Sequence, residues 1–234
     1  MYDERYMELW HALNRGVEGR NLFLDSQDYA RFVHNLYEFN DKTPVDSNHS
    51  RLFDTSRMMG LRNPSLGRAR KLLVDIHGWA LMKDHYHLLL SERIVGGLSL
   101  FLRKLNVGYA NYVNERYERK GTLFQGRTKK ILIGRQSHFL YILHYLHLNP
   151  LDYLHGAQKW RLRNKSGIRS VREALNYLDT YRWSSYLDYS GKKNFPSILT
   201  TSLFKDALGD YHNSLNEYLH DAEYGDGITK LILE

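Results

Sequence analysis

The chain has no cysteine among its 234 residues, so disulfide bonds and thiolate metal sites are excluded. It has no apolar run of 18 or more residues, so no membrane-spanning helix is expected. The first residues, "MYDERYMELW", lack the long apolar core of a secretory signal. Neither a P-loop nor a glycine-rich dinucleotide fingerprint occurs. These absences are compatible with a cytoplasmic protein whose chemistry needs no nucleotide cofactor.

Acidic residues are scarce in the middle of the chain. Residues 101–135 contain nine Lys or Arg and two acids, which gives this stretch a net charge of +7. Residues 159–172 contain six basic residues and no acid, whereas residues 201–234 contain two Lys and seven acids, which leaves −5. The whole chain carries +7, a balance that favours a polyanionic partner. Its 18 Tyr and four Trp could stack on unpaired bases, although core packing and a solvated charged face are the alternatives.

Hydrophobic periodicity predicts an α+β protein. Strands are expected at residues 7–13, 71–82, 85–91 and 126–134, and helices at 27–39, 97–117 and 137–148. Ser26 and Ser137 are the expected N-caps. The tight turn between the second and third strands falls at Lys83-Asp84, and the glycines of "NRGVEGR" are expected to supply positive φ angles.

The order β-α-β-β-α-β-α matches a ferredoxin-like split βαβ arrangement, in which an antiparallel sheet carries two helices on one face. We expect one domain over residues 1–150, with an insertion loop at 41–70 and a further helix at its end. Residues 151–234 are expected to form a C-terminal extension of helices and loops packed on that domain. We find no internal repeat or low-complexity tract.

His85 and His87 occupy alternate positions of the predicted third strand, in the run "DHYHLLLS". Residues at i and i+2 of a strand point to the same face, so the two imidazoles can meet at one point. With 12 histidines in the chain, a triplet of this kind also arises by chance. The alternative is a pair of half-buried strand histidines bonded to the backbone.

Tyr145 and Asn149 lie four residues apart in "ILHYLHLNP" and can project from one face of a helix. Two imidazoles, an amide oxygen and a phenol brought together would make a metal site with a nucleophile beside it. That combination suits phosphodiester transesterification. Three alternatives stay open: His144 and His147 could bind the metal instead, Tyr145 could be a core aromatic, and Asn149 could be only a helix C-terminal residue.

The stretch "GTLFQGRTKK" interleaves basic residues with an aromatic ring, a combination that suits phosphate contact and base stacking. An exposed basic edge strand is the alternative. The candidate DNA-binding residues are Lys104, Phe124, Gln125, Arg127, Lys129 and Lys130.

Five blocks, in order, resemble the HUH single-tyrosine transposases, specifically the REP-associated tyrosine transposases related to the insertion-sequence family. They are "WHALNRGVEGRNLFLDSQDYARFV", "GWALMKDHYHLLL", "LFQGR", "YLHLNP" and "YRWSSY", and they cover about residues 8–40 and 71–190. The chain departs from the family at Lys83-Asp84, where Pro-Asn is common. Thr128 also replaces a frequent Phe, and Leu151-Asp152-Tyr153 replaces small and basic residues.

The resemblance implies that Tyr145 is the nucleophile and that His85, His87 and Asn149 hold a divalent ion, Mg²⁺ or Mn²⁺. The implied activity is that of a single-stranded DNA endonuclease and strand transferase that forms a 5′-phosphotyrosine. The implied substrate is a palindromic-repeat hairpin with the cut in its flanking strand. A bacterial, nucleoid-associated monomer or homodimer would fit. An inactive nucleic-acid-binding protein and a water-using metal-dependent nuclease are the alternative functions.

Overall fold

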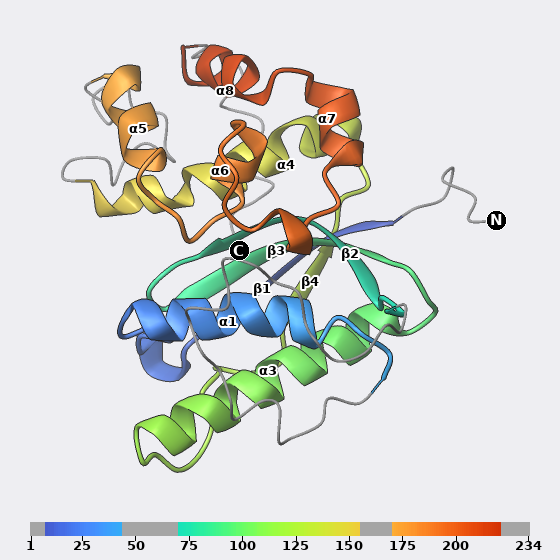
Figure 1. The fold of residues 1–234 in the computed structure, drawn as a ribbon, viewed down its shortest axis with the longest axis vertical. Coiled ribbons are helices and arrows are strands. Elements are labelled where there is room, and N and C mark those ends of the chain that lie inside the picture. The colour runs from blue at the N-terminus through green and yellow to red at the C-terminus, as the bar shows by residue number, and fades with distance from the viewer. Residues whose placement is uncertain (1–7, 44–69, 155–169, 221–234) are drawn as a thin grey trace.

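A four-stranded antiparallel sheet forms the centre of the computed structural model, which describes residues 8–43, 70–154 and 170–220 (Figure 1). The strands are β1 (Leu9–Arg15), β2 (Val74–Leu81), β3 (His85–Glu92) and β4 (Lys129–Leu132). Their order in the sheet is β2-β3-β1-β4. This order confirms the ferredoxin-like expectation. Most of the predicted insertion, most of the second basic stretch and the end of the acidic tail lie outside the described residues.

Two helices cover one face of the sheet, as expected: α1 (Ser26–Glu38) and α3 (Gly97–Arg116) (Figure 1). Their apolar side chains recur at helical spacing and pack on the strand residues that point toward them. Phe32, Tyr86, Phe101 and Tyr109 are all fully buried in this core.

The other face carries α4 (Gln136–Leu148) and the C-terminal helices (Figure 1). After α4 come the short helix η4 (Asn149–Tyr153), α5 (Val171–Leu178), α6 (Tyr186–Tyr189), η6 (Pro196–Ile198), α7 (Ser202–Leu208) and α8 (Tyr211–His220). Ala80 and Leu89 of the sheet share a second core with Leu143, Phe204 and Tyr211. Among the described helices, none has the length and apolar character to cross a membrane.

Side chains of β3 alternate between these two cores. Tyr86, Leu88 and Leu90 belong to the core under α1 and α3, whereas Leu89 belongs to the core under α4. His85 and His87 have the same parity as Leu89 and therefore face α4. The sheet thus directs both histidines toward α4, which carries Tyr145 and is followed directly by Asn149.

Several predicted boundaries were wrong by a few residues. The first strand begins at Leu9 and continues to Arg15, because it pairs with β3 over its whole length. Asp25, rather than Ser26, caps α1, since its carboxylate accepts from the backbone N–H groups of Gln27 and Asp28. Helix α4 begins at Gln136 after an extended Arg135 without a side-chain cap, so Ser137 lies inside it.

The turn after β1 uses its glycines differently from the prediction. Positive φ occurs at Glu18 and Gly19, whereas Gly16 has φ of −63°. Glycine is needed at position 16 because the backbone of Arg20 packs closely against it. A Cβ at Gly16 would lie 2.1 Å from the carbonyl oxygen of Arg20. Its N–H donates to the carbonyl of Asp84 at 2.7 Å. Gly16 therefore joins the end of β1 to the turn before His85.

Gly16→Ala should lower the free energy of unfolding by about 1–3 kcal/mol, because backbone atoms must move to admit the methyl group. The melting temperature should fall by roughly 2–4 °C for each kcal/mol lost. Gly126→Ala is the matched control, since a Cβ there meets nothing within 4 Å. Calorimetry of both variants checks the expectation, and equal melting temperatures would contradict the close-approach explanation.

Candidate active site

The turn between β2 and β3 holds the beginning of β3 in a fixed position. The N–H of Met82 donates to the carbonyl of His85 at 2.8 Å, which closes the tight turn predicted at Lys83-Asp84. The carbonyl of Lys83 accepts from the N–H groups of Leu22 and Phe23. With the Gly16 contact to Asp84, these bonds tie the turn to the chain that follows β1.

His85 and His87 lie together on the face toward α4, as the strand alternation predicted. Their ring centroids are 5.0 Å apart and their planes nearly perpendicular. The Nδ1 atom of His85 lies 2.7 Å from the Oδ1 atom of Asp84, whose pKa is lowered chiefly by this hydrogen bond. An ionised Asp84 accepts the Nδ1 proton, which in the neutral imidazole leaves on Nε2 the lone pair that a metal would need.

A third histidine, His11 of β1, adjoins His87. The Nε2 atom of His11 lies 2.9 Å from the Nδ1 atom of His87, and the two rings are stacked with centroids 5.1 Å apart. Burial lowers the pKa of His11 to about 4, so its imidazole is neutral at physiological pH. The sequence analysis did not single out His11. Its alternation with Leu9 and Leu13 was the available signal, since it places His11 on an apolar strand face.

Tyr145 lies over His87 and His11. Its ring is 5.9 Å from the ring of His87 and 6.2 Å from that of His11, edge-on to both. It is half-buried, whereas the residues on either side of it in α4 are buried. Three segments far apart in the sequence, β1, β3 and α4, therefore bring His11, His87 and the phenol of Tyr145 together.

Asn149 follows α4 directly and is fully buried. Its Nδ2 atom donates to the carbonyl of Tyr145 at 2.8 Å and to that of Leu146 at 3.4 Å. Both bonds use the amide nitrogen, so they fix the orientation of the side-chain amide. Its Oδ1 atom is the only atom of the amide group that could act as a metal ligand.

Helix α4 runs along β3 in the opposite direction. Leu143 packs beside Leu89 at Gly78, Tyr145 meets the ring of His87, and the hydroxyl of Tyr153 accepts from the N–H of Lys83 at 2.6 Å. Asn149 lies between Tyr145 and Tyr153 in the chain. It therefore lies toward the end of β3 at which His85 is found.

The donor set fits a divalent ion that accepts nitrogen ligands. Within the described residues, no three His, Asp or Glu side chains converge as a metal site. His85 and His87 with the amide oxygen of Asn149 would supply three ligands, and water or phosphate oxygens would supply the others. Imidazole suits Mn²⁺ better than Mg²⁺, which prefers oxygen ligands.

The alternative metal pair, His144 and His147, is engaged by the C-terminal helices. His147 is hydrogen-bonded to the hydroxyl groups of Tyr211 and Ser185, at 2.6 Å each. His144 is bonded to those of Tyr211 at 3.3 Å and Ser214 at 3.2 Å. Burial lowers the pKa of both histidines. Both nitrogens of each ring thus have hydrogen-bond partners in the protein, which favours a structural role for the pair.

The three candidate lysines lie in different places. Lys129 pairs with Leu13, which pairs with His87, so Lys129 shares the histidine face about 10 Å away across two strand spacings. Lys130 points to the opposite face and lies 3.2 Å from the hydroxyl of Ser99 in α3. Lys104 donates to the carbonyls of Asp41 and Thr43 at 2.5 and 3.2 Å, also on the α1–α3 side. Only Lys129 shares the face with His87.

The loop before β4 separates its aromatic residue from its polar ones. Phe124 is half-buried and packs against the α1–α3 core, edge-on to Tyr86 at 6.1 Å. Gln125 and Arg127 are exposed. The N–H of Gln125 donates to the carbonyl of Arg15 at 2.9 Å, which holds this loop against the end of β1.

Arg15 is a cation near His85 and His87. It was not among the predicted site residues. It pairs with His85 across β1 and β3 and is exposed on the same face. Its charge contributes to the lowered pKa of Asp84. The strand register places it there, and the sequence showed it only as part of an Arg-Gly turn.

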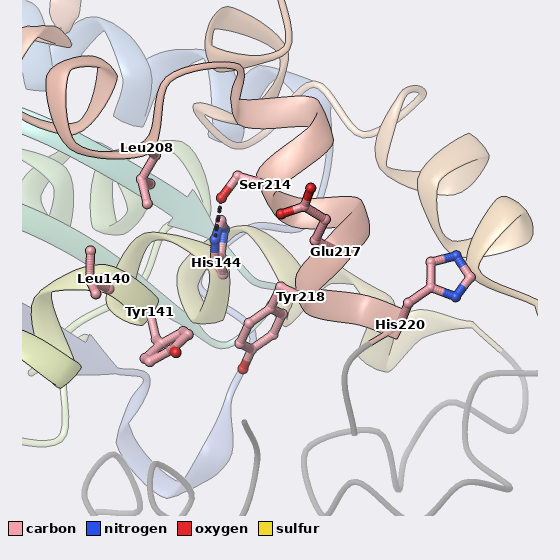
Figure 2. Close-up of a pocket in the computed structure, with 8 residues that line it drawn as sticks. All are labelled: Leu140, Tyr141, His144, Leu208, Ser214, Glu217, Tyr218 and His220. Carbon is pink, nitrogen blue, oxygen red and sulfur yellow. Dashed lines mark hydrogen bonds between the residues drawn. The ribbon is translucent and has the colours of Figure 1, made fainter. Parts of the chain in front are cut away.

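A pocket of about 700 Å³ lies between α4 and α8 (Figure 2). Figure 2 shows Tyr141 and His144 of α4 and Ser214, Glu217 and Tyr218 of α8 around it. It adjoins α4 one helical turn before Tyr145. The pocket residues are distinct from the residues that surround His85 and His87.

No family model matches the chain, and no curated protein matches it. One solved structure with a similar arrangement is described as "Structure of the REP associates tyrosine transposase bound to a REP hairpin". It is 12% identical, the match covers 87% of this chain and 93% of that chain, and the TM-score is 0.48.

Proposed function

We propose that the protein is a metal-dependent single-stranded DNA endonuclease and strand transferase in which Tyr145 is the nucleophile. The observation that supports it best is the half-buried Tyr145 ring lying edge-on to His87, beside His85 on the same strand face. A phenol next to two imidazoles that could hold a metal ion suits covalent attack on a phosphodiester.

His85, His87 and Asn149 would hold the divalent ion. When bound, such an ion polarises the scissile phosphate and offsets the negative charge that develops during attack. Asp84 orients His85 through its hydrogen bond, and the backbone bonds of Asn149 hold its amide group in place. These residues therefore prepare the site before DNA binds.

The reaction exchanges one phosphodiester for another. The hydroxyl oxygen of Tyr145 bonds to phosphorus while the bond from phosphorus to the 3′ oxygen breaks. The phenol proton is lost to water, and the 3′ oxygen takes up a proton. The product is a 5′-phosphotyrosine and a free 3′-hydroxyl, and attack by a 3′-hydroxyl on that linkage rejoins strands. Since the phosphotyrosine conserves the bond energy, no nucleotide cofactor is needed.

Three exposed cations near the end of β1 suit a DNA backbone. Arg15 pairs with His85, Lys129 shares the histidine face, and Arg127 is exposed in the loop that leads into β4. Arginine and lysine side chains bind phosphate oxygens and fix the register of the strand without reading its bases. We propose that these three residues bind the single-stranded flank of a hairpin.

Cleavage should require an unpaired segment, because a phosphodiester in a paired duplex is hard to bring in line with the half-buried Tyr145. The comparison uses one sequence as a palindromic hairpin with a single-stranded flank, as a blunt duplex and as an unstructured strand. We expect cutting in the flank of the hairpin substrate and little cutting of the duplex. Equal cutting of all three would refute hairpin-directed action, and preference for the duplex would overturn the single-strand proposal.

Asp84→Asn should weaken Mn²⁺ binding by about tenfold, because a neutral amide orients His85 less strongly than a carboxylate does. Isothermal titration of metal into the protein measures this directly. Asp206→Asn, which removes an exposed carboxylate from α7, is the control for the change in net charge. Unchanged affinity in Asp84→Asn would show that this hydrogen bond does not support the metal site.

A further inference from the structure

We propose that His11 is a positioning residue that fixes the tautomer and orientation of His87, and so does for His87 what Asp84 does for His85. The inference rests on the metal site of the proposed function. His11 belongs to β1, a strand that supplies neither a proposed metal ligand nor the proposed nucleophile.

The hydrogen bond between the rings allows two proton arrangements. In one, the Nε2 atom of His11 donates to the Nδ1 atom of His87, and neutral His87 then carries its own proton on Nε2. In the other, the Nδ1 atom of His87 donates to the Nε2 atom of His11. Only the second arrangement leaves the lone pair on the Nε2 atom of His87.

The two histidines of the pair then have matching surroundings. His85 has its Nδ1 atom 2.7 Å from the carboxylate of Asp84, and His87 has its Nδ1 atom 2.9 Å from the Nε2 atom of His11. In each case the Nδ1 partner directs the Nε2 atom away from itself. Partners of this kind orient the imidazole ligands of metal sites and select their tautomer.

The packing of His11 supports a fixed rather than an incidental contact. Its ring is buried, stacked on His87, and edge-on to Tyr145 at 6.2 Å. Because β1 and β3 are adjacent and paired through the whole of β1, the backbone holds both imidazoles in register. His11 thus contacts both a proposed ligand and the proposed nucleophile.

The first test reads the tautomer in the metal-free protein. Two-bond ¹H–¹⁵N correlation spectra distinguish protonated from unprotonated ring nitrogens, and His11→Gln and His87→Gln identify the two sets of signals by their loss. We expect His87 protonated on Nδ1 and His11 unprotonated on Nε2. A proton on the Nε2 atom of His87 would overturn the proposal.

The second test measures Mn²⁺ affinity by titration. His11→Gln keeps an acceptor oxygen near the position of Nε2 and should bind nearly as the wild type, whereas His11→Leu should bind about 10- to 100-fold more weakly. His77→Leu is the control for the loss of a buried histidine, because His77 is equally buried but bonds to Ser91 and Thr200 instead. Equal affinity of the Gln and Leu variants would contradict the proposal.

The two tests separate this inference from the proposed function. If the wild type binds no Mn²⁺, the metal part of the proposed function fails, while the spectra still decide the tautomer of His87. If the wild type binds Mn²⁺, and His11→Gln and His11→Leu bind it with equal affinity, the metal site stands and the positioning role of His11 fails.

Discussion

Tyr145→Phe is expected to abolish the covalent protein–DNA adduct and to reduce cleavage of single-stranded DNA by at least about a thousandfold. Only the attacking oxygen is lost, because the Phe ring can keep the edge-on packing against His87 and His11. DNA affinity should therefore stay nearly unchanged. Denaturing gels of labelled hairpin DNA measure the adduct, and a binding assay on the same samples measures affinity.

Tyr141→Phe is the matched control, since Tyr141 lies one turn earlier in α4 and borders the pocket beside α8 (Figure 2). It should cleave as the wild type does. An adduct that persists in Tyr145→Phe and disappears in Tyr141→Phe would assign the nucleophile to Tyr141 and refute the proposed role of Tyr145.

His85→Ala and His87→Ala are each expected to remove metal-dependent cleavage. Each loses one of two imidazole ligands in a site with few protein ligands, so Mn²⁺ affinity should fall by more than about a hundredfold, the upper range for outer-shell partners. Asn149→Ala should weaken cleavage less, with partial recovery at high Mn²⁺ concentration. Cleavage assays over a range of Mn²⁺ concentrations, with titrations on the same variants, check both expectations.

His144→Gln provides the control, because it changes the alternative pair of histidines and leaves His85 and His87 in place. It should keep the metal dependence of the wild type. A crystal soaked in Mn²⁺ that showed the ion on His144 and His147, with none at His85, would contradict the assignment.

The shared face of His85 and His87 was predictable because strand alternation is local and the turn at Lys83-Asp84 was recognisable. The proximity of Tyr145 to that face was not fixed by spacing alone. The spacing fitted a core aromatic as well as a nucleophile at Tyr145. Only the family resemblance favoured the nucleophile. Its half-buried position over His87 depends on how α4 packs on β2 and β3, a tertiary contact that periodicity does not specify.

The neighbours of the histidine pair could not be predicted from the sequence. His11 and Arg15 reach His87 and His85 through the pairing register of β1 with β3, which the sequence of either strand leaves open. Lys104 and Lys130 were proposed from charge alone. Charge does not show on which face of the sheet a lysine lies, and the structure places both on the α1–α3 side.

The most direct test of the central claim is to find where the DNA label goes. Wild-type protein is incubated with Mn²⁺ and a hairpin whose single-stranded flank is labelled, in separate samples, on either side of the cut. We expect the fragment bearing the 5′ phosphate to stay covalently attached to the peptide containing Tyr145, and the other fragment to be released with a free 3′-hydroxyl. Release of both fragments without any protein adduct would indicate attack by water and refute the role of Tyr145 as nucleophile.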